Sequence, residues 1–160
     1  MKEVLKLLLE GEAVSTPRMA AVLGASEADV EAALEALSTE KTLLGWRPVI
    51  NPTAVAENQV DALIEVSVTP ERGGGFNRIA QRIARFDQVR TCYLMSGGYD
   101  LMVVVRGANL LSIATFVAEK LSTLGGVQST ATRFMLRCYK ESGFLIESAE
   151  ADEGRPAVSP

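Results

Sequence analysis

The chain has 160 residues, 48% of them hydrophobic and 22% charged, and its formal net charge is −4. This balance fits one domain or two small ones and excludes wholesale disorder. Because the chain contains no histidine, catalysis by Ser-His-Asp or Cys-His groups and imidazole-ligated zinc or haem sites are excluded. No apolar run reaches the roughly 20 residues that span a bilayer, and the two cysteines have no metal-site or disulfide spacing. We therefore expect a cytoplasmic protein with reduced thiols, no cofactor and no membrane partner.

The first 52 residues have the pattern of three short helices followed by a strand. The apolar stripe of residues 2–11 predicts the first helix. Ser15 and Pro17 suit the start of the second helix. Ser26 suits the start of the third, because Asp29 follows it at the spacing of a capping box. These local signals predict a small helical domain over residues 1–52.

The second and third helices have the spacing of a helix-turn-helix. Ala20 is small enough for close packing, Gly24 permits the turn, and Val30 supplies an apolar contact from the next helix. Residues 41–52, KTLLGWRPVINP, are typical of a strand that ends in a turn. Together these features predict a winged helix-turn-helix.

The rest of the ordered chain alternates strands and helices. Residues 60–68 alternate apolar and polar side chains, as in a strand with one buried face. We expect helices at 75–86 and 109–122 and further strands at 89–95, 100–106 and 127–139. This βαββαβ order predicts a ferredoxin-like module over residues 53–147, and hence an α+β protein whose open sheet face needs a second subunit as cover. The acidic residues 148–160 are expected to be a disordered tail.

Residues 95–100, MSGGYD, join two of the predicted strands. The adjacent glycines favour a tight hairpin turn. Asp100 is a poor strand former, yet it stands at the start of an apolar strand. Either it caps N–H groups of the turn, or it contributes to a binding site, and the residues alone leave both interpretations open.

The helix predicted at residues 75–86 carries a row of three arginines. Arg78, Arg82 and Arg85 recur at helical spacing outside the apolar face. Such a row is compatible with nucleic-acid binding, but an ordinary solvated helix surface is the favoured interpretation.

Three segments carry a family resemblance along the ordered chain. They are MAAVLGASEADVEAAL, FDQVRTCYLMSGGYDLMVVV and GVQSTATRFMLRCYK. On these motifs, and on LLGWRPVINP, the chain resembles the Lrp/AsnC (leucine-responsive regulator/asparagine regulator) family of prokaryotic transcription factors. The resemblance implies a regulator of transcription rather than an enzyme, with double-stranded DNA as partner. It also implies homodimers, often assembled into octamers, and a small effector, commonly an amino acid, bound between subunits.

The resemblance also assigns site residues. Effector binding is expected at Ser96, Gly97, Gly98, Tyr99, Asp100, Gln128, Thr130 and Thr132. In such a site an aspartate accepts from the effector ammonium, while glycine N–H groups approach its carboxylate. DNA binding is expected at Arg18, Ser26, Glu27, Asp29, Lys41 and Arg47. No catalytic residue or metal ligand is expected.

The helix-turn-helix departs from the family pattern. Ala33 stands where the family usually has an arginine, and Lys41 where a glycine is usual. Residues 1–52 carry five Lys/Arg against eight Asp/Glu, and the outer face of the third helix is acidic, so it repels phosphates. The alternative hypothesis is therefore a metabolite-sensing or assembly protein with a weak or vestigial DNA-binding head. Sirohaem decarboxylases are similar in architecture but usually carry histidines, so that enzymatic hypothesis ranks lowest.

Overall fold

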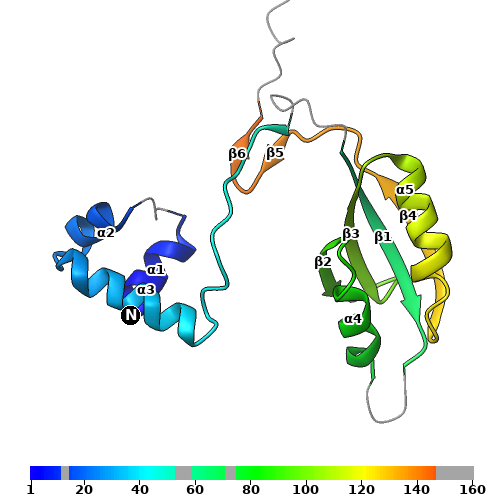
Figure 1. Cartoon of the computed structure of the whole chain (residues 1–160), viewed down its shortest axis with the longest axis horizontal. Helices are drawn as coiled ribbons and strands as arrows, with labels where there is room; N and C mark the ends of the chain where they lie inside the picture. The colour runs from blue at the N-terminus through cyan, green and yellow to red at the C-terminus, as the bar shows by residue number, and fades with distance from the viewer. Residues whose placement is uncertain (12–14, 53–58, 71–74, 147–160) are drawn as a thin grey trace, which may run out of the picture. The chain divides into compact units, whose positions relative to one another are not determined.

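The computed structural model describes residues 1–11, 15–52, 59–70 and 75–146. The chain divides into two compact units, of which the first comprises Met1–Val49 and the second begins at Ile50 (Figure 1). The domain boundary that we placed after residue 52 stays a prediction, and the proposed tail lies outside the described residues. Within those residues, no helix combines the length and the apolar character needed to cross a membrane.

The first unit consists of the three predicted helices. They are α1 (Lys2–Leu9), α2 (Thr16–Leu23) and α3 (Glu27–Thr39). Their small core contains Val4, Met19, Ala20, Val30 and Leu37, all buried. Gly24 ends α2 in the left-handed conformation, with φ +62°, as the turn of the motif requires. The helix-turn-helix predicted from spacing is therefore confirmed.

The strand predicted over residues 41–52 is not formed. Residues 44–50 belong to neither a helix nor a strand. A strand needs a neighbouring backbone to complete its hydrogen bonds, and no strand of the two described sheets includes residues 44–50. The sequence pattern is local, whereas the strand depends on a partner that the pattern does not specify.

The second unit has the predicted βαββαβ order. Its elements are β1 (Val60–Val68), α4 (Asn77–Ala84), β2 (Val89–Leu94), β3 (Leu101–Gly107), α5 (Leu110–Phe116), which continues as the π-helical segment η2 (Val117–Leu121), and β4 (Val127–Phe134). The strands form one sheet in the order β2-β3-β1-β4, and each neighbouring pair is antiparallel. This is the ferredoxin-like arrangement expected from the sequence.

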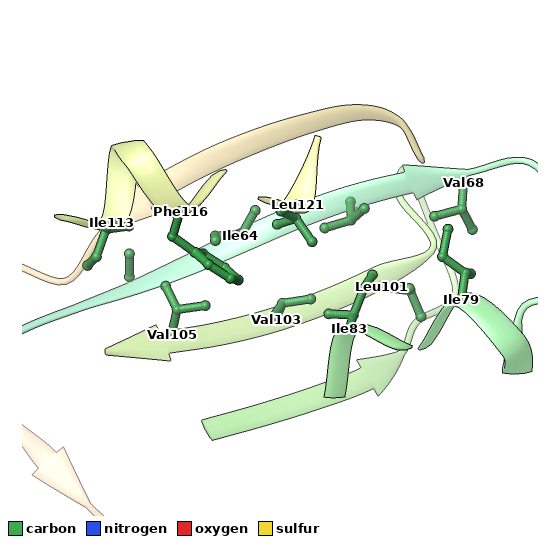
Figure 2. Close-up of a cluster of buried hydrophobic side chains, with 12 residues drawn as sticks. Ile64, Val68, Ile79, Ile83, Leu101, Val103, Val105, Ile113, Phe116 and Leu121 are labelled. Carbon is green, nitrogen blue, oxygen red and sulfur yellow. The ribbon is translucent and has the colours of Figure 1, made fainter. Parts of the chain in front are cut away.

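Both helices of this unit pack on one face of the sheet. Alternate residues of β1, from Ala62 to Val68, are buried on that face. Figure 2 shows side chains of α4 (Ile79 and Ile83) and of α5 (Ile113 and Phe116) beside those of β1 and β3. The opposite, open face carries the intermediate residues of the alternation, and no described helix of this unit lies on it. The period-2 pattern of β1 thus decided which side chains are available on the open face.

The last part of the chain corrects a second expected element. The strand predicted to run from residue 127 to residue 139 ends at Phe134. A short hairpin of β5 (Lys140–Glu141) and β6 (Phe144–Leu145) follows, which our sequence analysis missed. Its turn has positive φ at Ser142 and Gly143, and a Ser-Gly pair is a turn signal that would have predicted it.

Candidate effector site and DNA-binding face

The start of α3 is held by a capping box. The Ser26 Oγ accepts from the Asp29 N–H at 3.1 Å, and the Asp29 Oδ2 accepts from the Ser26 Oγ at 2.6 Å and from its N–H at 3.3 Å. The Ser26 hydroxyl, and after it the Ser26 N–H, hold the pKa of the Asp29 carboxyl below its ordinary value. Two of the residues expected to contact DNA therefore stabilise the helix start.

The other predicted DNA-binding residues form a mixed surface. Arg18, Lys41, Arg47 and Glu27 are exposed. On α3 itself, Glu31 and the other acidic residues beyond the cap are exposed, too. No Lys or Arg belongs to α3 itself, so the positive charges of this unit lie on other segments. Lys41, where the family usually has glycine, has φ +57° and so adopts the conformation that glycine accommodates more readily.

The MSGGYD segment is a longer loop than the predicted tight turn. The strands end at Leu94 and begin again at Leu101, and the Met95 N–H donates to the Asp100 carbonyl at 2.8 Å. Gly97 has φ +135°, a conformation that other residues rarely adopt. The loop is closed by a backbone hydrogen bond, with Ser96, Gly97 and Gly98 exposed between its two ends.

Asp100 joins this loop to the end of β1. Its carboxylate Oδ2 accepts from the Val68 N–H at 2.8 Å, and its own N–H donates to the Val66 carbonyl at 3.1 Å. The side chain therefore caps a backbone donor, as one interpretation proposed, but the donor lies 32 residues away and not in the turn itself. Since one carboxylate oxygen already has this partner, a role in binding rests on the other oxygen.

The three predicted effector residues of β4 do not face the same way. Thr130 and Thr132 pair with Val66 and Ile64, so both lie on the face that the helices cover. Thr130 Oγ1 is 3.3 Å from the Ser122 hydroxyl, at the end of η2. The structure therefore places these two threonines away from the open sheet face.

Gln128 lies at an irregularity of the ladder between β1 and β4. The register shifts there, because Ser67 pairs with Ser129 but Val68 pairs with Val127. The Gln128 Nε2 donates to the Thr69 Oγ1 at 2.9 Å, just beyond the end of β1. Gln128 and Asp100 thus both act at the end of β1, and they are the predicted pair that the fold brings to a common place.

The open sheet face carries ion pairs that the sequence analysis did not single out. Arg133 binds Glu65 through two hydrogen bonds, Nε to Oε1 at 2.8 Å and Nη2 to Oε2 at 3.0 Å. Arg106 binds Asp61 in the same bidentate way, with both distances at 2.6 Å. The sequence signal for the two carboxylates was the alternation along β1, which puts Asp61 and Glu65 on the face away from the buried positions. Only the register of the neighbouring strands identifies their partners.

Glu65 and Arg133 each shift the pKa of the other. The Arg133 guanidinium lowers the pKa of Glu65, and the Glu65 carboxylate raises the pKa of Arg133 above its ordinary value. A smaller electrostatic contribution to the raised Arg133 pKa comes from Tyr99 of the predicted effector loop.

A half-open recess of about 280 Å³ lies at the other end of β3. Its wall comprises Val105, Ile113 and Phe116, the polar side chains of Gln88 and Ser112, and residues 106–108. The loop of residues 95–100 precedes β3, whereas this recess surrounds the last residues of β3. The recess therefore includes none of the predicted effector residues.

Comparison with known proteins identifies the chain's relatives. A family model described as the Lrp/AsnC ligand binding domain matches residues 61–145. YugG, an HTH-type transcriptional regulator of Bacillus subtilis (strain 168), is 40% identical over 159 residues, which cover 99% of this chain and 95% of that protein. The proline dehydrogenase transcriptional activator of Rhizobium radiobacter is 25% identical over 141 residues, which cover 88% of this chain and 90% of the activator.

A solved structure supports the same fold over both units. A transcriptional regulator from Neisseria meningitidis, in complex with L-Met, aligns with a TM-score of 0.65 at 18% identity. The alignment covers 89% of this chain and 92% of that one. At this identity the likeness shows the fold alone, whereas the family match and the 40% identical relative show descent. The chain belongs to the Lrp/AsnC family of transcriptional regulators, which are not enzymes.

Proposed function

We propose that this regulator binds double-stranded DNA through α2 and α3 and senses a small effector, an amino acid, in its second unit. Membership of the Lrp/AsnC family carries the proposal. The Neisseria meningitidis regulator of the same fold is complexed with L-Met, which supports the class of effector. We further propose that the protein acts in the cytoplasm as a homo-oligomer, a dimer that assembles to an octamer.

The open sheet face is the proposed dimer contact. Leu63 of β1 pairs with Val104 of β3 on this face, and the Asp61–Arg106 ion pair lies two residues further along each strand. Bidentate arginine–carboxylate pairs tolerate desolvation better than single charges, because each charge keeps its partner. A second copy covering this face would bury the apolar positions without leaving an unpaired charge.

Sedimentation of a charged variant tests the dimer contact. A carboxylate introduced by Val104→Glu would be buried against the second copy, so we expect it to shift the protein toward the monomer. Thr115→Glu, on the exposed side of α5, is the matched control and should keep the parent's assembly. A Val104→Glu variant that sediments like the parent would remove the open face from the proposed interface.

The effector site is proposed at the loop end of the sheet. Gly97 and Gly98 leave their N–H groups accessible to a carboxylate, while the remaining Asp100 oxygen accepts from an ammonium. Gln128 contributes an amide at the same end of β1. Thr130 and Thr132 lie on the helix-covered face, so we leave them out of this proposed site. Their role in effector binding stays a prediction.

Thermal shifts over the amino acids test the effector site. Asp100→Asn keeps an oxygen acceptor for the Val68 N–H but removes the negative charge, so it should fold while losing the shift given by the cognate amino acid. Thr123→Ala, on the exposed end of the helical layer, is the control. If Asp100→Asn keeps the parent's shifts, Asp100 has no role in effector binding and its contribution is structural.

DNA binding is tested by titrating the protein against a duplex from its own promoter region at increasing salt. We expect stronger binding to this duplex than to nonspecific DNA, with affinity that falls as salt rises. Equal affinity for both duplexes at every salt concentration would reject the DNA-binding part of the proposal.

The acidic face of α3 favours a second candidate, a sensing or assembly protein with a weak head. Glu27 and Glu31 are exposed on the helix that would face DNA. A Glu27→Lys/Glu31→Lys variant that gains strong nonspecific DNA binding would show that charge alone limits the head. Glu3→Lys/Glu10→Lys on α1 is the control with the same change in charge. A specific promoter interaction of the parent would instead reject this candidate.

A further inference from the structure

A basic flank of the second unit remains unexplained by the proposed effector and dimer sites. Arg78, Arg82 and Arg85, here called the arginine flank, are all exposed on α4 or at its end. At 3.6 residues per turn they fall within a sector of about 60° around the helix axis. Ile79 and Ile83 of the same helix are buried against the sheet, as Figure 2 shows. This packing fixes the rotation of α4 and keeps the flank at the surface.

The stretch of sequence that carries the flank is poor in negative charge. No acidic residue occurs within α4, and Asp87 is the one carboxylate between residues 75 and 92, where exposed Arg90 adds a fourth cation. Within the described ranges, the structure gives Arg82 and Arg85 no ion pair. These two guanidiniums therefore differ from Arg106 and Arg133, which are committed to carboxylates of β1.

The character of the flank favours phosphate over a protein surface. Protein interfaces rely on buried aromatic and aliphatic anchors, yet none of the exposed large hydrophobic side chains of the described residues lies on α4. Guanidinium groups match phosphate oxygens in bidentate geometry. Along the helix the three arginines are separated by about 6 Å and about 4.5 Å, while each DNA strand carries one phosphate per about 3.4 Å of axis. Arg82 and Arg85 can therefore contact neighbouring phosphates of one backbone.

We infer that the arginine flank binds the phosphate backbone of the DNA that the regulator occupies. This inference rests on the proposed DNA-binding function. The first 52 residues carry five Lys/Arg against eight Asp/Glu, and α3 is acidic, so cations elsewhere in the protein would add to the neutralisation of phosphates. The flank supplies them on the second unit, independently of sequence, and each further subunit of an oligomer adds another flank.

The test compares full-length variants that lose equal charge. In Arg82→Gln/Arg85→Gln, two phosphate contacts are lost, and the slope of log affinity against log salt should decrease by about 2 per subunit bound. Lys120→Gln/Lys140→Gln removes two exposed cations elsewhere in the same unit and should leave the slope unchanged. Arg82→Lys/Arg85→Lys keeps the charge and should retain most of the parent's slope. All variants are measured on the promoter duplex and on nonspecific DNA.

The outcomes separate this inference from the proposed function. A parent that fails to bind the promoter duplex better than nonspecific DNA overturns the proposed function itself. A parent that binds, with an Arg82→Gln/Arg85→Gln variant of unchanged slope, overturns the arginine-flank inference alone. Sedimentation of the same variants tests whether a changed slope comes from altered assembly. If Arg82→Gln/Arg85→Gln changes the assembly, the flank is a contact between subunits, which also overturns the inference.

Discussion

The two units each contain an aspartate that sequence comparison assigned to binding, and both aspartates cap backbone N–H groups. In the first unit, Asp29 pairs with Ser26 three residues away. In the second, Asp100 binds the N–H of Val68, 32 residues away along the chain. A residue in a family's functional motif can therefore be required by the fold as well, and only short-range requirements are visible in the sequence.

The largest expected effect is that of removing the long-range cap. Asp100→Ala leaves the half-buried Val68 N–H without its acceptor, so we expect a loss of about 1–3 kcal/mol in the stability of the second unit. Amide hydrogen exchange along β1 measures this directly. Asp87→Ala, which removes an exposed aspartate of the same unit, should have little effect. Equal exchange of β1 in both variants would mean that the Asp100 bond contributes nothing to stability.

The local cap should have a smaller effect that is confined to the first unit. Ser26→Ala removes the acceptor for the Asp29 N–H, and loss of such a cap costs about 1 kcal/mol. We expect faster amide exchange in the first turns of α3 and unchanged exchange in β1. Ser38→Ala, near the other end of the same helix, is the control. An effect spread over both units would contradict the separation that makes the comparison useful.

A still smaller change is expected at Lys41. Its φ of +57° strains an L-residue, and glycine relieves that strain while adding backbone freedom to the unfolded chain. Because these contributions oppose each other, Lys41→Gly should stabilise the first unit by only about 0.5 kcal/mol. Lys41→Ala controls for the loss of charge and should not stabilise. A destabilised glycine variant would show that the lysine side chain itself makes a favourable contact.

Acid should weaken both units, because each contains a carboxyl group whose pKa is lowered in the folded state. Arg133 lowers the pKa of Glu65 from its ordinary 4.5, so their pair stabilises the fold above that value and ceases to do so as pH falls through the folded pKa. Glu65→Gln should therefore be less stable than the parent at neutral pH, and the difference should vanish in acid.

Asp29→Asn should behave likewise in α3, because the pKa of Asp29 is also lowered. We expect these effects to be the smallest, and urea unfolding at a series of pH values measures them. A difference between Glu65→Gln and the parent that persists in acid would assign the effect to packing.

Local patterns predicted most elements because they depend on residues within a turn or two. The alternation of β1 correctly placed Ala62, Ile64 and Val66 in the core. The Ser26 capping box and the left-handed Gly24 were equally local and were confirmed. Where an element needed a distant partner, the same patterns were misleading, as for residues 41–52.

The candidate effector site shows how far such reasoning extends. The family resemblance grouped Gln128, Thr130 and Thr132 of the last strand as part of one effector site. The register shift at Gln128 breaks the alternation along β4, so the amide reaches Thr69 while both threonines face the helices. A bulge of this kind depends on how two strands meet and leaves little signal in either strand alone.

The sequence by itself determined the α+β order, the capping box of α3, the buried face of β1 and the family, because each depends on short-range spacing or on motif similarity. Tertiary structure alone decided that Asp100 caps Val68, that Arg133 and Arg106 bind the carboxylates of β1, and that the arginine flank is left with Arg82 and Arg85 outside any described ion pair. The physical reason is that a hydrogen bond or an ion pair depends on distance in space. Strand register and helix rotation set that distance, and neither is fixed until the core packs.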